Sequence, residues 1–465
     1  MTSGTEVRSA AAFLPQGIVE DVCFEVESGR IRSVKHERGE LAQRRLGLLV
    51  PGMPNLHSHA FQRALVGRAE HRTIQDPSQS DSFWTWREEM YRIAQRLDEE
   101  ALFSVASLLY VEMLEAGYTS VGEFHYLHHG PDGVAPPERG AYGRVLLEAA
   151  AEAGIRMTLL PVPYFTGGFD RPADPRQRRF LHRDAEDFLQ LLTGLAQDVK
   201  RSGARLGVAP HSLRAVPLRI LEDILDGARE VLGSSHPIHV HVSEQEAEVE
   251  SCLKATGRRP VALLLERFEV GSSWCLVHAT HVDAAERAAL AASGAVVGLC
   301  PSTEANLGDG HFAFEAYLDE DGLFGVGSDS HVTVDPAEEL RHLDYQARLR
   351  RRRRGVVARD GDPPRPGITL WGRAQTGGAQ ALGEKVSGLT PGALADWVEL
   401  NLEHPRLAGL APAAALDAFL LGSAPGAVRS VWVAGRPVVE DGRHPLRDAA
   451  ERRFRSAMKQ WTVEG

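Results

Sequence analysis

The fold of this chain is decided by the stretch VPGMPNLHSHAFQ, which occupies residues 50–62. It follows the apolar run Leu46–Val50, so we interpret it as the exit of a buried strand into a loop. Side chains two residues apart on a strand point to the same side, and His57 and His59 can therefore present two imidazoles to one point. Neutral imidazoles at that spacing suit a borderline cation such as zinc. Taken alone, however, a His-x-His motif is more typical of two hydrogen-bonded surface histidines.

Beyond this stretch, apolar runs alternate with segments of helical period. Eight strand-like runs can be counted, and they are Leu48–Val50, Ser120–Phe124, Met157–Val162, Leu206–Ala209, Ile238–Val242, Cys275–His278, Ala295–Leu299 and Leu323–Ser328. Helical stretches between them include Glu100–Glu115, Ala141–Ala153, Ala185–Arg201, Leu218–Leu232 and Ala284–Ala292. This alternation favours a parallel sheet wound with helices. Eight such units predict a (β/α)8 TIM barrel, whose active site lies where the strands end.

Short strands are also predicted towards both ends of the chain. They are Val22–Val26, Ile31–Val34, Trp397–Leu400, Ser430–Val433 and Pro437–Val439. Because chain ends often lie close together, we expect residues 1–50 and 385–465 to form one small β-sandwich domain. Residues 51–384 then form the barrel, and the predicted fold class is α/β.

The composition restricts where the protein works and what it binds. A formal charge of −11 argues against general nucleic-acid binding, which prefers a basic surface. The only basic block is Arg350–Arg354, which we interpret as the solvated end of a helix. The four cysteines are scattered without a Cys-x-x-Cys pair, which suits a reducing compartment. No signal pattern and no bilayer-spanning apolar run are present, so we expect a cytoplasmic protein without membrane partners.

Polar side chains gather at the predicted carboxyl ends of the strands. Grouped by strand, they are His57 and His59; Glu123, His125, Tyr126, His128 and His129; His211 and Arg214; His241 and Glu244; His278 and His281; and Asp329 and His331. A solvated rim would not be expected to carry so many histidines together with well-spaced carboxylates. As a set, these residues predict an active site that can hold a metal.

Four motifs of this set carry a resemblance to a known family. They are PGMPNLHSH at residues 51–59, HVSE at 241–244, HATH at 278–281 and GSDSH at 327–331. With them the chain resembles the amidohydrolase superfamily, in its mononuclear deaminase-like branch, over essentially its whole length. Three further segments are similar to the deiminases that act on N-formimino-L-glutamate in histidine breakdown, and they are FWTWR at 83–87, EFHYLHH at 123–129 and PHSLR at 210–214.

The resemblance implies that one divalent metal is held by His57, His59, His241 and Asp329. The chemistry of these residues agrees, because three imidazoles and one carboxylate can hold zinc and leave a position for water. Zinc lowers the pKa of that water towards roughly 7, and Asp329 could accept its proton. No lysine at the ends of the middle strands suggests a carbamylated bridge, which favours a single ion. The same nitrogen and oxygen ligands also accept iron(II).

Glu244 and His278 are implied to be catalytic groups beside the metal, together with Asp329. The expected reaction is hydrolysis of N-formimino-L-glutamate to N-formyl-L-glutamate and ammonia, in which Glu244 carries a proton to the terminal nitrogen. Arg87 and Arg214 suit this small anionic amidine, because planar guanidinium forks bind carboxylates bidentately. The other residues expected to bind the substrate are Gln62, Tyr126 and His211.

Two other functions stay open on the sequence. A deaminase of a purine or pyrimidine base, such as guanine, would fit the same scaffold, with a base stacked on Phe83, Trp84 and Trp86. A catalytically inactive barrel that serves as a binding subunit would have lost a metal ligand or Glu244, whereas every position is filled here. We expect a homodimer, since barrels of this kind often pair.

Several histidines also have a purely structural alternative. His281 could replace His278 as the reactive member of its motif, although the position at the strand end favours His278. His239 shares a face with His241 but lies one layer deeper, which indicates packing. Capping and loop groups remain an alternative for His125, His128 and His129.

Overall fold

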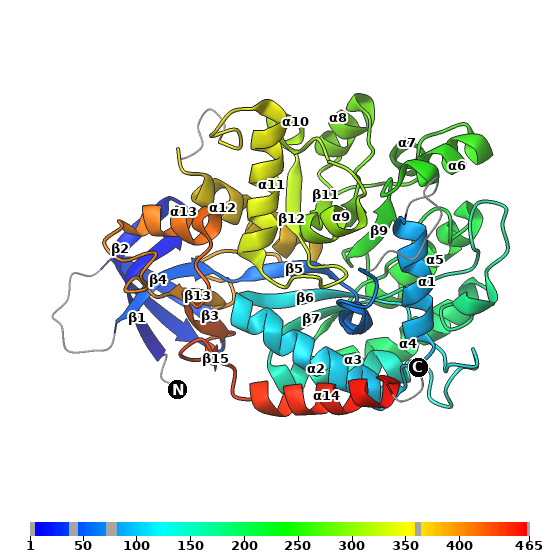
Figure 1. The fold of residues 1–465 in the computed structure, drawn as a ribbon, viewed down its shortest axis with the longest axis horizontal. Helices are drawn as coiled ribbons and strands as arrows, with labels where there is room; N and C mark the ends of the chain where they lie inside the picture. The colour runs from blue at the N-terminus through cyan, green and yellow to red at the C-terminus, as the bar shows by residue number, and fades with distance from the viewer. Residues whose placement is uncertain (1–4, 37–44, 71–80, 359–363, 463–465) are drawn as a thin grey trace.

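The computed structural model describes residues 5–36, 45–70, 81–358 and 364–462 (Figure 1). Strands from both ends of the chain lie together at one end of the molecule. The rest of the chain consists of strands and helices in alternation, as the sequence predicts. The class is therefore α/β with parallel sheets.

The α/β part contains two four-stranded sheets whose strands are all parallel. The first has the order β5 (Met53–Ser58), β6 (Tyr118–His125), β7 (Arg156–Pro161) and β8 (Arg205–Leu206). The second has the order β12 (Leu323–Val326), β11 (Val296–Leu299), β10 (Trp274–His278) and β9 (Ile238–Val242). Isolated parallel bridges pair Ser58 with Asp329 and Val208 with Ile238. The β5 edge of the first sheet therefore lies beside the β12 edge of the second, and the β8 edge lies beside the β9 edge.

Helices follow the strands and end where the sequence predicts. Four helices end at a glycine with positive φ, a backbone conformation that glycine adopts without steric cost. They are α2 (Glu99–Ala116), α3 (Ala141–Ala153), α4 (Ala185–Ser202) and α8 (Ala284–Ser293). The other helices are α1 (Phe83–Ala94), α5 (Leu218–Leu232), α6 (Glu246–Thr256), α7 (Pro260–Arg267), α9 (Pro301–Leu307), α10 (Phe314–Asp319), α11 (Pro336–Arg351), α12 (Pro366–Ala381), α13 (Pro412–Gly422) and α14 (Arg447–Thr462), with the 3₁₀ helices η1 (Ala60–Leu65) and η2 (Pro175–Gln177).

Both ends of the chain contribute to one seven-stranded sheet with the order β15-β14-β13-β4-β1-β2-β3. Its strands are β1 (Thr5–Leu14), β2 (Gly17–Glu27), β3 (Arg30–His36), β4 (Leu46–Pro51), β13 (Trp397–Leu400), β14 (Val428–Val433) and β15 (Arg436–Val439). Strand β4 links the two halves, because it pairs parallel with β1 and antiparallel with β13. Strands from the two ends of the chain therefore pair directly.

The first strand of the α/β part lies later in the chain than the sequence indicated. The apolar run Leu48–Val50 belongs to β4 in the terminal sheet, and the strand that carries the first histidine is β5. The chain crosses between the two sheets at Gly52, whose backbone packs against Thr119 without room for a side chain. Both strands are largely buried, so apolar character could not tell which sheet each one joins. His57 consequently lies on β5 rather than in a loop beyond a strand.

Some other strands are shorter than their apolar runs. Only Leu206 of the run 206–209 lies in a strand, and the Val208 backbone donates instead to the Pro237 carbonyl before β9. Strand β11 begins at Val296 and β12 ends at Val326. These are shifts of one to three residues, the usual uncertainty of predicted strand ends.

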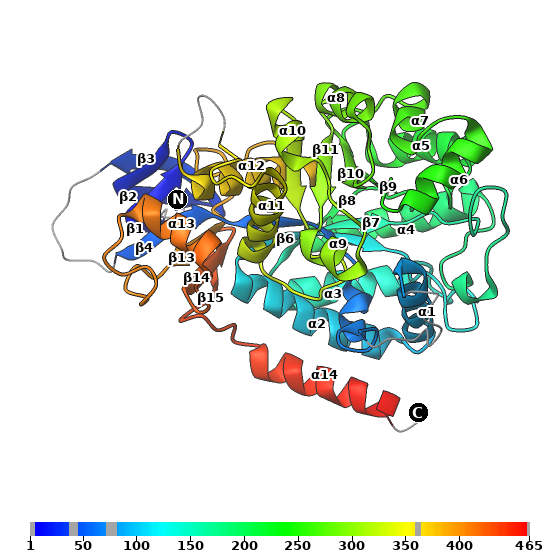
Figure 2. The same ribbon diagram turned by 45° about the horizontal axis from the view of Figure 1, so that its top comes forward.

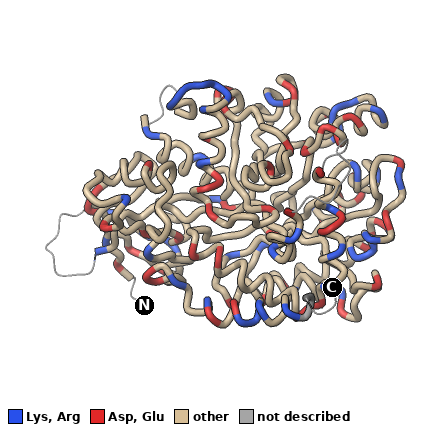
Figure 3. Tube along the Cα trace, in the orientation of Figure 1, with Lys and Arg blue, Asp and Glu red and all other residues tan. Residues whose placement is uncertain are grey.

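The surface carries the predicted basic block at the exposed end of α11 (Figure 3). Arg350 and Arg351 form ion pairs with Glu315 there, so the block is a solvated helix end. The last helix, α14, runs along the outer side of α2 (Figure 2). Among the described helices, none is long and apolar enough to cross a membrane.

Candidate metal centre and active site

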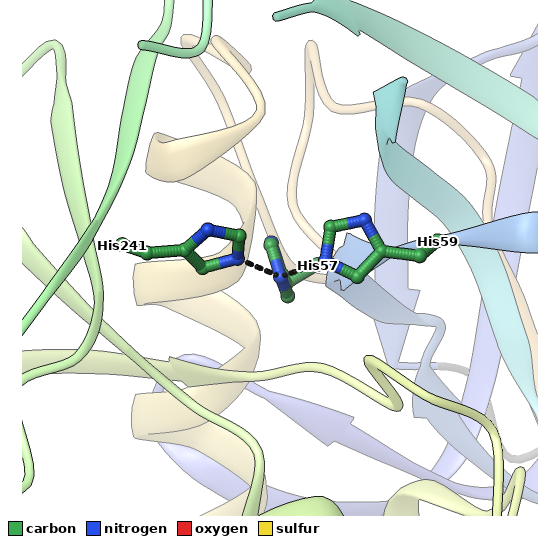
Figure 4. A group of neighbouring side chains, drawn as sticks. All are labelled: His57, His59 and His241. Atoms are coloured by element: carbon green, nitrogen blue, oxygen red, sulfur yellow. Dashed lines mark hydrogen bonds between the residues drawn. The ribbon is translucent and has the colours of Figure 1, made fainter. Parts of the chain in front are cut away.

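Three buried imidazoles converge at the carboxyl ends of β5 and β9 (Figure 4). His57 lies on β5, His59 follows that strand, and His241 lies on β9. The Nε2 atom of His57 is 3.1 Å from His59 Nε2 and 3.0 Å from His241 Nε2. Residues far apart in the chain thus meet at one point.

The nitrogen atoms of this cluster fit a cation between them. His59 donates its Nδ1 hydrogen to the Phe124 carbonyl at 2.9 Å, and His241 donates its own to the His211 carbonyl at 3.1 Å. Their Nε2 atoms are therefore hydrogen-bond acceptors. A neutral His57 carries at most one hydrogen on Nε2, and that hydrogen cannot be donated to both acceptors. A bound ion would satisfy all three lone pairs. Tetrahedral zinc with bonds of about 2.0–2.1 Å separates its nitrogens by ~3.3 Å, close to the distances found.

Asp329 supplies a carboxylate at the same point. Its Oδ1 atom lies 3.5 Å from His57 Nε2 and 3.4 Å from His59 Nε2. Burial lowers the pKa of His57 to about 3. Burial has the opposite effect on a carboxyl group and would raise the pKa of Asp329. The hydrogen bond with His57 and the neighbouring histidines outweigh it and hold the pKa of Asp329 below its usual value. Neutral imidazoles and an ionised carboxylate are the forms that bind a divalent metal.

Glu244 and His278 lie beside this cluster, near the ends of β9 and β10. The Nε2 atom of His278 is 3.7 Å from Glu244 Oε1 and 3.8 Å from Asp329 Oδ2. Burial raises the pKa of Glu244 to about 7, so this carboxyl group can exchange protons near neutral pH. Burial lowers the pKa of His278, but the surrounding carboxylates outweigh it and raise that pKa to about 10. The pair can therefore hold and exchange protons next to the candidate ligands.

Two buried carboxylates outside the recognised motifs hold this pair in place. Glu304, in the first turn of α9, accepts hydrogen bonds from His278 Nδ1 at 3.2 Å and from the Cys300 backbone at 2.9 Å. Glu248, in the first turn of α6, accepts one from the Glu244 backbone at 3.1 Å. An acidic residue in the first turn of a helix that follows a strand end is the sequence signal that could have identified both.

The cluster lies at one end of a pocket. Ten of the predicted residues line it, and they are His59, Gln62, Arg87, Tyr126, His211, Arg214, His241, Glu244, His278 and Asp329. His57 is buried behind them. Six other lining residues have no predicted site role, and they are Met90, Tyr91, Tyr164, Phe180, Thr303 and Leu307. Apolar and aromatic residues on helices and loops carry no chemical signal by themselves, so the structure was needed to find them.

Two guanidinium groups enter the pocket, one from α1 and one from the loop after β8. Arg87 forms no ion pair with any described residue, and Arg214 lies 3.8 Å from Glu244 Oε2. The Nε atom of each is buried without a hydrogen-bond partner in the described part of the chain. The Trp84 ring packs against the Arg87 guanidinium at 4.4 Å. The pocket therefore offers positive charge that suits an anion.

Neutral polar groups complete the pocket. Gln62 Nε2, on η1, lies 2.8 Å from the Tyr126 hydroxyl. The Oε1 atom of Gln62 is buried and finds no partner among the residues described. The ring of His211 lies 5.0 Å from that of His241. All three predicted neutral contacts thus lie beside the candidate ligands.

The other histidines of the strand ends lie outside the cluster. His281 donates through Nε2 to the Asp309 carbonyl at 2.7 Å, whereas His278 faces the cluster. His239 donates to the Ala381 carbonyl at the end of α12, and His331 contacts serine hydroxyls. A separate group of histidines contains His125 at the end of β6, His128 and His129 in the loop after it, and His182 between η2 and α4.

Known proteins resemble this chain over most of its length. The amidohydrolase family matches the chain over residues 48–438. The formimidoylglutamate deiminase of Pseudomonas aeruginosa is 46% identical over 446 residues, which cover 95% of this chain and 96% of that relative.

Solved structures show the same relationship. An amidohydrolase from Brucella melitensis is 42% identical and has a TM-score of 0.91, with 98% of this chain and 99% of that chain covered. A zinc-bound adenosine deaminase from Xanthomonas campestris has a TM-score of 0.80 over 98% of each chain. At 20% identity it indicates a shared fold alone. With a family match over most of its length and such relatives, the chain belongs to the amidohydrolase family.

Proposed function

We propose that this protein hydrolyses the terminal C–N bond of N-formimino-L-glutamate, so that ammonia leaves and N-formyl-L-glutamate remains. The observation that carries the proposal is that one pocket contains both a histidine–carboxylate cluster and two guanidinium groups, of which Arg214 is buried and Arg87 half-buried. The cluster provides for hydrolysis, and the guanidinium groups fit the two carboxylates of a glutamate moiety. The 46% identical formimidoylglutamate deiminase supports the same substrate.

We assign one divalent ion, with zinc as first choice and iron(II) as second, to the ligand set His57, His59, His241 and Asp329. When bound, such an ion activates water and stabilises negative charge on the reacting group. The proton-exchanging pair Glu244 and His278 lies on the pocket side of this set. The substrate therefore reaches the ligand set and the pair from one direction.

Glu244 is the residue that moves protons. Its carboxylate can accept a proton from the attacking water and deliver it to the terminal nitrogen of the protonated formimino group, which then leaves as ammonia. The second proton of that water passes from the new hydroxyl group to Asp329 as the C=O bond forms. His278, with Nε2 between Glu244 and Asp329, stabilises the charge that develops on the oxygen. Delivery to the terminal nitrogen, and not to the glutamate nitrogen, decides that ammonia is released instead of formamide.

Arg87 and Arg214 bind the carboxylates of the substrate, and the neutral contacts come from Gln62, Tyr126 and His211. Fixing the carboxylates holds the formimino carbon opposite Glu244, and a displacement of about 1 Å can cost roughly 100-fold in rate. The Trp84 ring is already packed on Arg87. Trp84 does not line the pocket, whereas Phe83 and Trp86 do, so the stacking of a base would depend on those two rings.

The architecture that we propose is a closed (β/α)8 barrel over residues 51–384. The isolated bridges at both seams between the two parallel sheets support closure. Residues 1–50 and 385–465 then form the small β-sandwich domain, and a separate hydrophobic core around Phe24 and Trp397 supports this division. That the enzyme works as a cytoplasmic homodimer stays a prediction.

Ammonia release by the zinc-loaded protein tests the reaction. N-formimino-L-glutamate is compared with guanine, cytosine and adenosine, and the second product is identified by mass spectrometry. We expect turnover of the amidine alone, with N-formyl-L-glutamate as the second product. A preference for a base would overturn the substrate, and formamide in place of ammonia would overturn the role of Glu244.

A further inference from the structure

Gln177 joins two tyrosines of the pocket wall. Its Nε2 atom lies 2.9 Å from the Tyr91 hydroxyl and 2.6 Å from the Tyr164 hydroxyl. Tyr91 comes from α1 and Tyr164 from the segment after β7, so Gln177 holds two separate parts of the chain together. All three side chains are buried, and the two tyrosines line the pocket.

The orientation of the Gln177 amide is fixed by the local sequence. Residues 174–177, which read DPRQ, form a capping box at the start of η2. In this box the Asp174 backbone N–H donates to Gln177 Oε1 at 2.7 Å. A flipped amide would place an NH₂ group against that N–H, and two donors would face each other. The NH₂ group must therefore face the tyrosines.

A count of hydrogens then fixes the role of the two hydroxyls. Because the Gln177 amide donates to both phenolic oxygens, each hydroxyl keeps its own hydrogen to donate elsewhere. At most one of the two hydroxyl hydrogens can be donated to the oxygen of the other tyrosine. At least one O–H is left over, and no described residue accepts it. Burial raises the pKa of both hydroxyls, so they stay protonated.

The surroundings identify the chemistry of the missing acceptor. Arg87 and Arg214 are the charged neighbours of both tyrosines, and each has an Nε atom without a partner in the described residues. Two hydroxyl donors beside two guanidinium groups favour an anion over a neutral amide. We propose that Tyr91 and Tyr164, held as donors by Gln177, bind a carboxylate of the substrate beside the two arginines. The identity of that substrate rests on the proposed function.

Calorimetric binding of two dicarboxylates to the metal-loaded protein tests this donor pair. The probes are glutarate and N-formyl-L-glutamate, and the variants are Tyr91→Phe, Tyr164→Phe and the double variant, which keep both rings. We expect the double variant to bind each probe about tenfold or more weakly, the effect of losing one hydrogen bond to a charged group. Tyr317→Phe is the matched control, because Tyr317 is equally buried but donates to the Leu323 carbonyl outside the pocket. Its binding should be unchanged.

Two variants of Gln177 separate donor orientation from simple packing. Gln177→Glu places an acceptor where the amide donates, so both hydroxyl hydrogens turn away from the pocket. We expect this variant to bind glutarate at least as weakly as the double tyrosine variant. Gln177→Met removes the donor without adding an acceptor, and it should bind glutarate more tightly than Gln177→Glu.

The possible outcomes separate this donor pair from the proposed reaction. Equal binding by the wild-type protein and the double variant would overturn the tyrosine donors, whether or not ammonia is released. Tyrosine-dependent binding of glutarate without turnover of N-formimino-L-glutamate would retain the carboxylate site and overturn the reaction. A wild-type protein that binds neither dicarboxylate would overturn both.

Discussion

The two ends of the pocket are built from different parts of the fold. The metal end consists of residues at or next to strand ends, where backbone pairing sets their positions; the Asp329 N–H, for example, donates to the His57 carbonyl at 3.0 Å. The carboxylate end comes from α1 and from loops, where side-chain contacts set the positions. Gln177 donates to the Tyr91 hydroxyl, and the Arg87 guanidinium packs on the Tyr91 ring. The reaction type therefore depends on the sheets, and substrate choice depends on the segments around them.

The largest effect is expected at the metal end. Removal of divalent metal by a chelator should abolish ammonia release, because the three imidazoles then have no ion to bind and activate water. Added zinc should restore the rate in proportion to the metal bound per chain, measured by mass spectrometry. Full activity in the metal-free protein would contradict the claim that the metal end determines the reaction type.

Glu244→Gln should lower kcat by about 10²–10⁴-fold, because an amide cannot accept and pass on a proton. Metal content should stay at the wild-type level, since Glu244 is not a ligand. The KM for N-formimino-L-glutamate should change little. Retained turnover would contradict the proton transfer assigned to this residue.

Arg87→Met tests the carboxylate end. We expect kcat/KM for N-formimino-L-glutamate to fall by roughly 10–100-fold, because the variant loses charge-assisted hydrogen bonds. A short amidine without carboxylates, such as N-methylformamidine, separates the two ends. The wild-type protein and the variant should hydrolyse it at the same low rate, and a loss on this substrate too would place Arg87 in the chemistry.

Glu304→Met should lower kcat by about 10-fold or more with little change in KM, because His278 loses the acceptor that orients its ring. Glu304→Gln keeps an acceptor oxygen and should recover most of the rate. Glu339→Met is the matched control, since Glu339 is a buried carboxylate that accepts from the Ser302 backbone at 2.9 Å. Equal losses in the Glu304→Met and Glu339→Met variants would indicate general damage rather than positioning.

The smallest effect on catalysis is expected from Glu384, which lies at neither end and forms ion pairs with Arg156 and Arg205. Burial would raise the pKa of Glu384, but the hydrogen bond from Arg205 and the charge of Arg156 hold it below its usual value. A lowered pKa contributes stability above the unfolded pKa and loses it as the pH falls. Glu384→Gln should therefore lower the free energy of unfolding by about 1–3 kcal/mol at pH 7 and leave kcat unchanged.

Urea unfolding of both proteins as a function of pH measures this effect. The difference in the free energy of unfolding between the wild-type protein and the Glu384→Gln variant should shrink as the pH falls below about 4.5. A difference that is independent of pH would show that the ion pairs are not its source.

The two ends also differ in how far the sequence predicts them. Strand periodicity placed His57 and His59 on one side, and reading only the strand ends added His241 and Asp329. The same reasoning could not place β5, because two buried apolar runs follow each other and only packing decides which sheet each one joins.

At the carboxylate end, prediction reached the arginines through their charge but not the groups that orient the site. Tyr91 and Gln177 are brought together by the packing of α1 against η2, a contact that no local pattern records. Glu304 acts on His278 across two different strand–helix units. Such partners depend on long-range packing, so they emerge only from the structure.

The metal centre is tested most directly by anomalous diffraction at the zinc edge from crystals of the zinc-loaded protein. We predict one peak per chain, enclosed by His57, His59, His241 and Asp329 on the side of the pocket. The absence of a peak there, or a peak only among the separate histidines around His128, would contradict the metal centre and the proposed hydrolysis with it.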